Sequence, residues 1–378
     1  MRLRMPVSPK QRVQECVVAY TLALRPSTPA LTRPQRVLLK VEGEQIIDIE
    51  YRPDGGDGSP FAQAGRMGFE QLVAAANGAC PTCGTAHALA LCHAVEALAA
   101  IAVPRRAAVL RVIAAELERV ASHLAAVATI FEALTLPKLA APFTNEARVA
   151  RKALHDLRGE SGVGWLVPGG VAQNLADEPR ALITQAVAAS LDRLMVLAKQ
   201  SLAQRFLLAR TVEVGVITTS AAEQFGLSGP LARAAGLKAD LRVDMQYAAY
   251  DEFQPKLVTE EGGDVHARLS VLIFEALESL RLAERAVREL PTGPIRGALP
   301  TKLPTGVGEG AAEAPRGPVH YKIEANGQRL GTVGCRPAPQ IDRLLARAAL
   351  VNATVDDAAL IFVSTDPCDT CLGMTHDF

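Results

Sequence analysis

The sequence predicts a mainly α fold with some β structure: a central bundle of long helices, with small β hairpins near both ends. Hydrophobic residues make up 49% of the 378 residues but aromatics only 4%, so Ala, Leu and Val dominate, as in closely packed helices. Long stretches repeat apolar residues with a helical period, and two short segments alternate around a tight turn. We divide the chain into an N-terminal segment, 1–34, and one domain, 35–378.

The first half of the domain begins with a predicted hairpin. Residues 35–52 contain two apolar runs around Gly43, and residues 53–60 are a glycine-rich loop. From residue 66 to 134 the apolar period is helical. Pro104 interrupts it, and proline suits the first turn of a new helix.

The second half is also mainly helical and contains a second predicted hairpin. Three further helices are predicted, over 144–158, 177–208 and 264–290. The stretch 291–318 is rich in Gly and Pro. A second hairpin over 319–333 turns at Asn326-Gly327, a strong signal for a two-residue turn.

The charge balance and the apolar stretches indicate where the protein is located and which classes of partner it does not bind. The chain has 40 basic and 40 acidic side chains, which gives no sign of nucleic acid or an anionic membrane surface. Its longest apolar stretch, 86–103, carries two His and a Glu, so it predicts a buried helix and no membrane insertion. The N-terminus lacks the cleavage pattern of a secretory signal, so we predict a cytoplasmic protein. Seven cysteines, an odd number, make disulfides a poor explanation.

Two Cys-x-x-Cys pairs carry the strongest chemical signal. Cys80 and Cys83 lie in "ACPTCGTAH", and Cys368 and Cys371 lie in "DPCDTC" at the end of the chain. Four thiolates suit one soft metal site, although short zinc ribbons place their pairs much closer together. Cys83 is predicted to open a helix over 83–103, where the helix dipole favours thiolate. The alternative is two unrelated pairs of buried cysteines.

These motifs resemble a known family. "CPTCGTAHALALCHAVE" and "DPCDTC" are similar to the two metal-binding motifs of nickel–iron (NiFe) hydrogenase large subunits. "RMGFEQL", "ELERVASHL", "VPGGV" and "EAPRG" match other segments of that family in the same order. The resemblance runs from about residue 35 to residue 371, and it implies a hydrogenase large-subunit-like fold.

The resemblance implies a set of site residues. The metal ligands would be Cys80, Cys83, Cys368 and Cys371, which in the family hold nickel and an iron that carries CO and cyanide. Arg316 and Asp366 would be a catalytic pair above the metals, and His87 would lie beside the ligands as part of the cofactor site. The alternatives are a core histidine at His87 and a surface arginine at Arg316.

Other polar residues are interpreted as structural. A set on one helix is predicted to form a buried polar network between helices: Glu116, Glu118, Arg119 and His123. Three cysteines have no partner at ligand spacing: Cys16, Cys92 and Cys335. The family often has a metal-binding His where this chain has Met374, and whether His376 takes that role stays open.

Three departures from the family direct the functional prediction. The chain is short, it ends just after the last cysteine, and "KVEGE" (40–44) is a poor match for the family's proton-relaying Glu motif. These features resemble the HupK/HoxV maturation proteins. The predicted function is therefore not enzymatic: a scaffold that holds an Fe(CN)2CO fragment for a hydrogenase large subunit, its partner together with other maturation proteins.

Two other functions remain open. One is a catalytic or hydrogen-sensing large subunit that binds nickel and oxidises H2 with an iron–sulfur small subunit. The other is a quinone-reductase-type subunit that has lost its metals, although two intact cysteine pairs argue against it.

Overall fold

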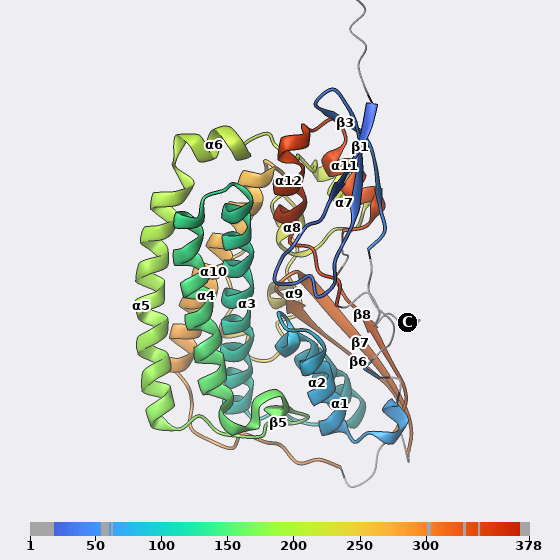
Figure 1. Cartoon of the computed structure of the whole chain (residues 1–378). Helices are drawn as coiled ribbons and strands as arrows, with labels where there is room; N and C mark the ends of the chain where they lie inside the picture. The colour runs from blue at the N-terminus through green and yellow to red at the C-terminus, as the bar shows by residue number, and fades with distance from the viewer. Residues whose placement is uncertain are drawn as a thin grey trace, which may run out of the picture.

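A bundle of four long helices forms one side of the molecule, and a three-stranded sheet with two helices forms the other (Figure 1). The computed structural model describes residues 19–53, 60–61, 63–300, 304–327, 330–338 and 341–370. The predicted mainly α fold with small β pieces near both ends is confirmed.

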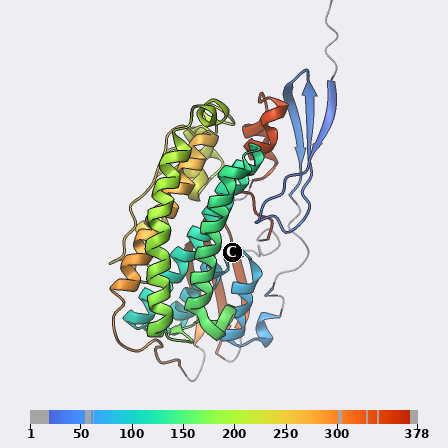
Figure 2. The same cartoon turned by 60° about the vertical axis from the view of Figure 1, so that its left-hand side comes forward.

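The bundle contains α3 (Arg105–Ala133), α4 (Pro137–Arg158), α5 (Asp177–Leu202) and α10 (Val265–Arg288), which run side by side in both cartoon views (Figure 2). Helix α3 is buried on all faces from Ala107 to Phe131, and its many alanines let α4 and α10 pack closely against it. The central helix of the bundle therefore carries buried side chains in every direction.

The second layer consists of α1 (Phe69–Ala79), α2 (Gly84–Ala99) and an antiparallel sheet. The sheet strands, in order, are β6 (Thr305–Ala314), β7 (Gly317–Asn326) and β8 (Leu330–Arg336). The β7–β8 hairpin confirms the second predicted hairpin. Strand β6, in contrast, falls in the Gly- and Pro-rich stretch for which the sequence predicts no strand.

Close packing explains the glycines of β6. An added Cβ at Gly308 would lie 2.1 Å from the carbonyl oxygen of Ala94, and one at Gly310 would lie 2.3 Å from that of Ala90. Both carbonyls belong to α2, so the backbones of α2 and β6 are in contact. Glycine disfavours strands in general, but here only glycine leaves room for α2 against the strand.

A second small sheet lies near the N-terminus. It consists of β1 (Ala19–Leu24), β2 (Val37–Glu42) and β3 (Gln45–Tyr51), all antiparallel. The β2–β3 hairpin confirms the first prediction, and Gly43 at its turn has φ +63°, which favours glycine. The domain boundary after residue 34 stays a prediction; β1, which precedes it, pairs with β2.

The C-terminal helices α11 (Arg343–Leu350) and α12 (Ala358–Ser364) pack beside this sheet and α3. The remaining elements are short: α6 (Arg205–Thr211), α7 (Thr219–Gln224), α8 (Gly229–Arg233), α9 (Leu241–Asp244), β4 (Leu166–Val167), β5 (Gly170–Val171), η1 (Ala64–Arg66), η2 (Gly159–Gly164) and η3 (Val355–Asp357).

The predicted helices exist with shifted ends. Helix α4 begins at Pro137, earlier than predicted, because proline is accommodated in a first turn. The helix predicted over 177–208 is two helices, α5 and α6. Helix α10 begins after Asp264, whose carboxylate accepts a hydrogen bond from the Ala267 N–H.

Helices α2 and α5 are the two apolar helices to consider as possible membrane spans. Helix α2, which contains most of the stretch 86–103, is buried from Gly84 to Val95 with one half-exposed residue, His93. Among the described helices only α5 is long and apolar enough to cross a membrane. In its most apolar 18-residue stretch, 28% is buried inside the protein. It packs along α4 and α10 in the bundle.

Candidate metal centre

The first cysteine pair lies in the tight connection between α1 and α2. Cys80 directly follows α1, and Cys83 is the N-cap of α2. Their Sγ atoms are 2.9 Å apart, longer than the ~2.05 Å of a disulfide. Two sulfurs that each lie ~2.3 Å from one ion are within ~4.6 Å of each other, so the pair fits two ligands of one soft metal. Gly84 is required here, because a Cβ would lie 2.0 Å from the Asn77 carbonyl oxygen.

Glu118 fixes the start of α2. Its carboxylate accepts hydrogen bonds from the backbone N–H of Thr85 at 2.7 Å and of Ala86 at 3.1 Å, and from the Thr85 hydroxyl at 2.6 Å. A carboxylate at a helix N-terminus satisfies free N–H groups and complements the helix dipole. Glu118 therefore joins α3 to α2 and holds the segment that carries Cys83.

Arg316 connects the two cysteine motifs. It lies in the two-residue turn between β6 and β7 and is largely buried. Its Nη1 donates to the Thr82 hydroxyl at 2.9 Å, and its Nη2 donates to the Asp366 carboxylate at 2.8 Å. The Thr82 hydroxyl is in turn 3.4 Å from Cys80 Sγ. The predicted pair Arg316 and Asp366 thus lies in contact, next to the first cysteine motif.

The electrostatics of Arg316 place a third cysteine nearby. Burial alone would lower the pKa of this guanidinium, but Asp366 and the thiols of Cys368, Cys83 and Cys80 together raise it. Because Coulomb interactions weaken with distance, these groups lie near the Arg316 guanidinium. Cys368 is 4% exposed. Within the described residues no three Cys, His, Asp or Glu side chains form a complete metal cluster, so the ligand set stays a prediction.

His87 is a buried histidine with partners of its own. Its Nδ1 is 2.9 Å from the Tyr321 hydroxyl. Burial lowers the pKa of His87, but a hydrogen bond with Cys335 and the charges of Cys335 and Cys80 outweigh burial and raise it. His87 therefore has hydrogen-bond partners in the core, with Cys335 among them, and its role in a cofactor site stays a prediction.

The predicted polar network on α3 is confirmed. His123 Nε2 is 3.0 Å from Glu275, and Arg242 donates to Glu116 at 3.0 Å. Arg119 donates to the carbonyl oxygen of Ala314 at 3.1 Å. Sequence reasoning missed the residues on other elements that bind these side chains or extend the network: Arg233, Asp240, Arg242, Tyr250, Glu275 and Glu313.

Its cationic neighbours keep Glu275 of this network ionised. Burial raises the pKa of Glu275, but Arg233 and His123 outweigh burial and lower it to about 2. Arg233 donates to Glu275 at 2.5 and 3.1 Å and to Glu313 at 3.0 Å. A charged residue inside the apolar run "SVLIFEAL" of α10 was the available sequence signal for Glu275.

A cavity of about 420 Å³ opens beside Cys80. Its polar lining includes Thr82, Glu118, Ser122, Arg151, His155 and Arg158. A small molecule or water can therefore come close to the first cysteine motif.

Several other sequence candidates cannot be placed at this site or lie away from it. Cys16, Cys371, Met374 and His376 lie outside the described residues. Glu42 and Glu44 of "KVEGE" are exposed at the β2–β3 turn, whereas Cys80, Cys83 and Cys368 are buried. That string therefore supplies no carboxylate beside the described cysteines.

Comparison with known proteins identifies relatives along nearly the whole chain. The family model of the respiratory-chain NADH dehydrogenase 49 Kd subunit matches residues 162–305. The chain is 27% identical to the carbon monoxide-induced hydrogenase of Rhodospirillum rubrum, over 93% of this chain and 98% of that protein. It is 29% identical to the membrane-bound hydrogenase subunit alpha of Pyrococcus furiosus, over 92% and 85%.

Two further matches extend the comparison. An NADH-quinone oxidoreductase subunit of Salinispora arenicola is 31% identical over 82% of this chain and 81% of its own length. A solved structure of the membrane-bound sulfane sulfur reductase, an archaeal respiratory membrane complex, has a TM-score of 0.85 at 21% identity, covering 94% of this chain and 98% of that one. The latter match shows a shared fold.

These relatives overturn three predictions. The maturation-scaffold function and the non-enzyme assignment are wrong, because the matched proteins are hydrogenases and oxidoreductase subunits. The free cytoplasmic location is contradicted by a membrane-bound relative. The HupK-like role and its Fe(CN)2CO cargo have no support. The short length of the chain pointed to a maturation protein. A hydrogenase relative is equally short, since this chain spans 98% of it.

Proposed function

Because the chain belongs to the superfamily that unites the 49 kDa subunit of respiratory-chain NADH dehydrogenase with nickel–iron hydrogenase large subunits, we propose that it is the metal-binding catalytic subunit of a membrane-associated hydrogenase-type oxidoreductase. The observation that carries this proposal is the buried Cys80–Cys83 pair, joined through Thr82 and Arg316 to the segment of Cys368. Buried thiolates next to one cation suit a soft metal.

Each residue has a defined part in this proposal. Cys80, Cys83, Cys368 and Cys371 would hold nickel and iron, and the bound metals would supply the redox chemistry of hydrogen activation. Arg316, fixed by Asp366, presents positive charge to the centre of the site. The cavity beside Cys80 gives small molecules a way in.

The proposal includes partner subunits. The names of two relatives describe them as subunits of a membrane-bound hydrogenase and of an NADH-quinone oxidoreductase. A hydrogen-activating site must pass its electrons on, so we propose an electron-carrying iron–sulfur subunit as the direct partner. Membrane association would come through such an assembly.

A second candidate function is supported by the family model that matches residues 162–305. It is a quinone-reducing subunit of the NADH dehydrogenase type, working without a metal of its own. The buried cysteine pair favours the first candidate, because a metal-free subunit has no need of adjacent thiols in its core.

Metal analysis of the anaerobically purified complex separates the two candidates. The hydrogenase proposal expects stoichiometric nickel and iron, and hydrogen-dependent reduction of an artificial electron acceptor. Cys80→Ser should lose both, since a hydroxyl is a poor ligand for soft metals. Cys92→Ala, a change at a buried cysteine of α2, serves as the control and should keep both. Quinone reduction by a complex whose subunit contains neither metal would overturn the proposal.

A further inference from the structure

Asp369, directly after Cys368, is held by a segment from the other end of the chain. Its side chain is 2% exposed. It accepts hydrogen bonds from the Thr32 N–H at 2.9 Å, the Thr32 hydroxyl at 2.9 Å, the Arg33 N–H at 2.8 Å and the Gln35 side-chain amide at 3.3 Å. A carboxylate has about four acceptor sites, so the site is filled.

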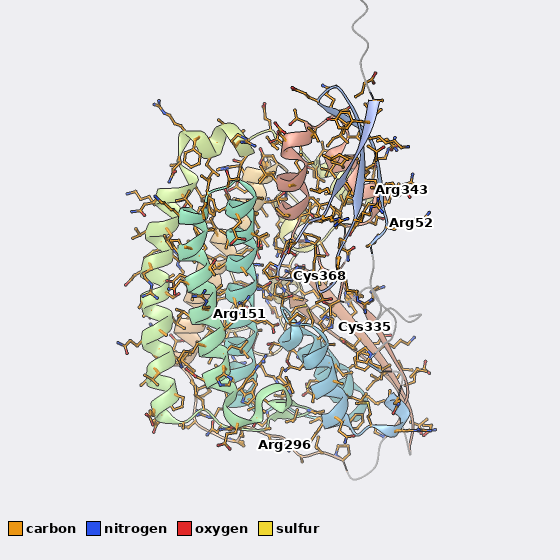
Figure 3. The ribbon with its side chains drawn as sticks, in the orientation of Figure 1. Arg52, Arg151, Arg296, Cys335, Arg343 and Cys368 are labelled. Carbon is orange, nitrogen blue, oxygen red and sulfur yellow. The ribbon has the colours of Figure 1, made fainter. Side chains whose placement is uncertain are left out.

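These contacts anchor only one side of Cys368. On the other side, Asp366 is bound by Arg316 through both its carboxylate and its carbonyl oxygen. Between them, the carbonyl oxygen of Pro367 accepts a hydrogen bond of 3.4 Å from the Thr28 hydroxyl. The cysteine therefore lies between two fixed points, near the middle of the molecule (Figure 3).

The donors select for a carboxylate. Thr32 and Arg33 present two consecutive backbone N–H groups, which form a small anion-binding concavity. An asparagine at position 369 has one acceptor oxygen, and its NH2 group would face at least one of these donors. Charge-assisted bonds of this kind are about twice as strong as neutral ones.

We propose that Asp369 is a positioning residue, which holds the C-terminal cysteine motif against residues 32–35 and so sets the place of Cys368 relative to Cys80 and Cys83. The expected effect on metal binding rests on the proposed function. The expected effect of Asp369 on the position of Cys368 does not. Residues 28–35 contain no cysteine. By this proposal they are nevertheless necessary for an ordered metal site.

Four variants test the contact. Asp369→Asn removes the charge, and Thr32→Val removes one hydroxyl at an exposed position with little change of shape. Thr32→Ser keeps the hydroxyl and should behave as the native protein. Asp192→Asn, on the exposed face of α5, is the matched control.

The first readout is independent of metal. The full-length chain is produced without nickel, and iodoacetamide modification of each cysteine is followed by mass spectrometry. A buried thiol reacts only when its segment opens, so the modification rate reports the opening equilibrium. Asp369→Asn and Thr32→Val should make Cys368 react roughly tenfold faster, as expected for loss of a charge-assisted hydrogen bond. Cys92, at 0% exposure, should stay protected and reports the overall fold.

The second readout is the nickel and iron content of the anaerobically purified complex. Asp369→Asn should retain less metal than Asp192→Asn, and Thr32→Ser should match the native level. If Cys92 also becomes reactive in Asp369→Asn, that variant has lost its fold. The modification rate of Cys368 in Thr32→Val then tests the inference. Native modification rates at Cys368 in both variants would overturn the inference. Faster modification in a chain whose native form binds no metal would support the contact while the proposed function fails.

Discussion

The Arg316 guanidinium donates two hydrogen bonds to Asp366, 50 residues further along the chain: one to the carboxylate at 2.8 Å and one to the carbonyl oxygen at 3.0 Å. Asp366 has φ +50°, a left-handed conformation that costs energy in a residue other than glycine. The paired contacts with Arg316 hold that conformation. They also orient the residues just before Cys368.

Arg316→Lys should therefore leave the fold intact but lower the metal content. Lysine keeps the charge but lacks the fork that contacts Thr82 and Asp366 together. We expect nickel and iron in the purified complex to fall at least several-fold, with a melting temperature within a few degrees of native. Arg281→Lys, at an arginine that is 53% exposed, is the control. Full metal occupancy in Arg316→Lys would reduce Arg316 to a structural residue.

Glu275→Gln should strongly destabilise the protein. The carboxylate lies between His123 and Arg233 and is 2% exposed, so its neutralisation leaves the buried Arg233 charge without its main partner. Breaking a buried pair in this way costs about 3–5 kcal/mol. Urea denaturation measures the difference. Glu284→Gln, which removes a partly exposed pair with Arg288 on the same helix, should cost about 1 kcal/mol or less. Equal losses in the two variants would contradict the assignment.

Acid should weaken the fold in a range set by the same carboxylate. The pKa of Glu275 falls from 4.5 to about 2 in the folded state, because Arg233 and His123 outweigh burial. A lowered carboxylate pKa contributes stability above the unfolded value, and this stability disappears as the pH falls from about 4.5 towards 2. The contribution is on the order of 3 kcal/mol. Denaturation curves at pH 7, 4 and 3 should show this loss, and Glu275→Gln should flatten the profile.

Gly308→Ala should disturb both the fold and the metal site. An added Cβ would lie 2.1 Å from the Ala94 carbonyl oxygen, so β6 must move away from α2, which begins at the cysteine motif. Overpacking of this kind typically costs about 1–3 kcal/mol. Gly331→Ala in β8 places its Cβ 3.5 Å from the nearest atom and should be tolerated. Thermal melting and metal analysis check both variants. Equal stability would show that the contact between the two backbones relaxes easily.

Local patterns in the sequence were sufficient for the framework. The helical period predicted the bundle helices, and Gly43 and Asn326-Gly327 predicted the two hairpins, because periodicity and turn residues act over a few neighbouring positions. The two Cys-x-x-Cys motifs were likewise visible, and so was the likeness to the hydrogenase superfamily. Chain length, however, carried no information on function.

Contacts between distant segments were decided only by the tertiary structure. Strand β6 looked irregular because its glycines are required by α2, more than 200 residues away along the chain. Glu116 binds Arg242 of α9, and His123 binds Glu275 of α10. Asp369 meets Thr32 across 337 residues. Such pairs leave no local signal, since each residue is determined by a neighbour that only folding brings within hydrogen-bond distance.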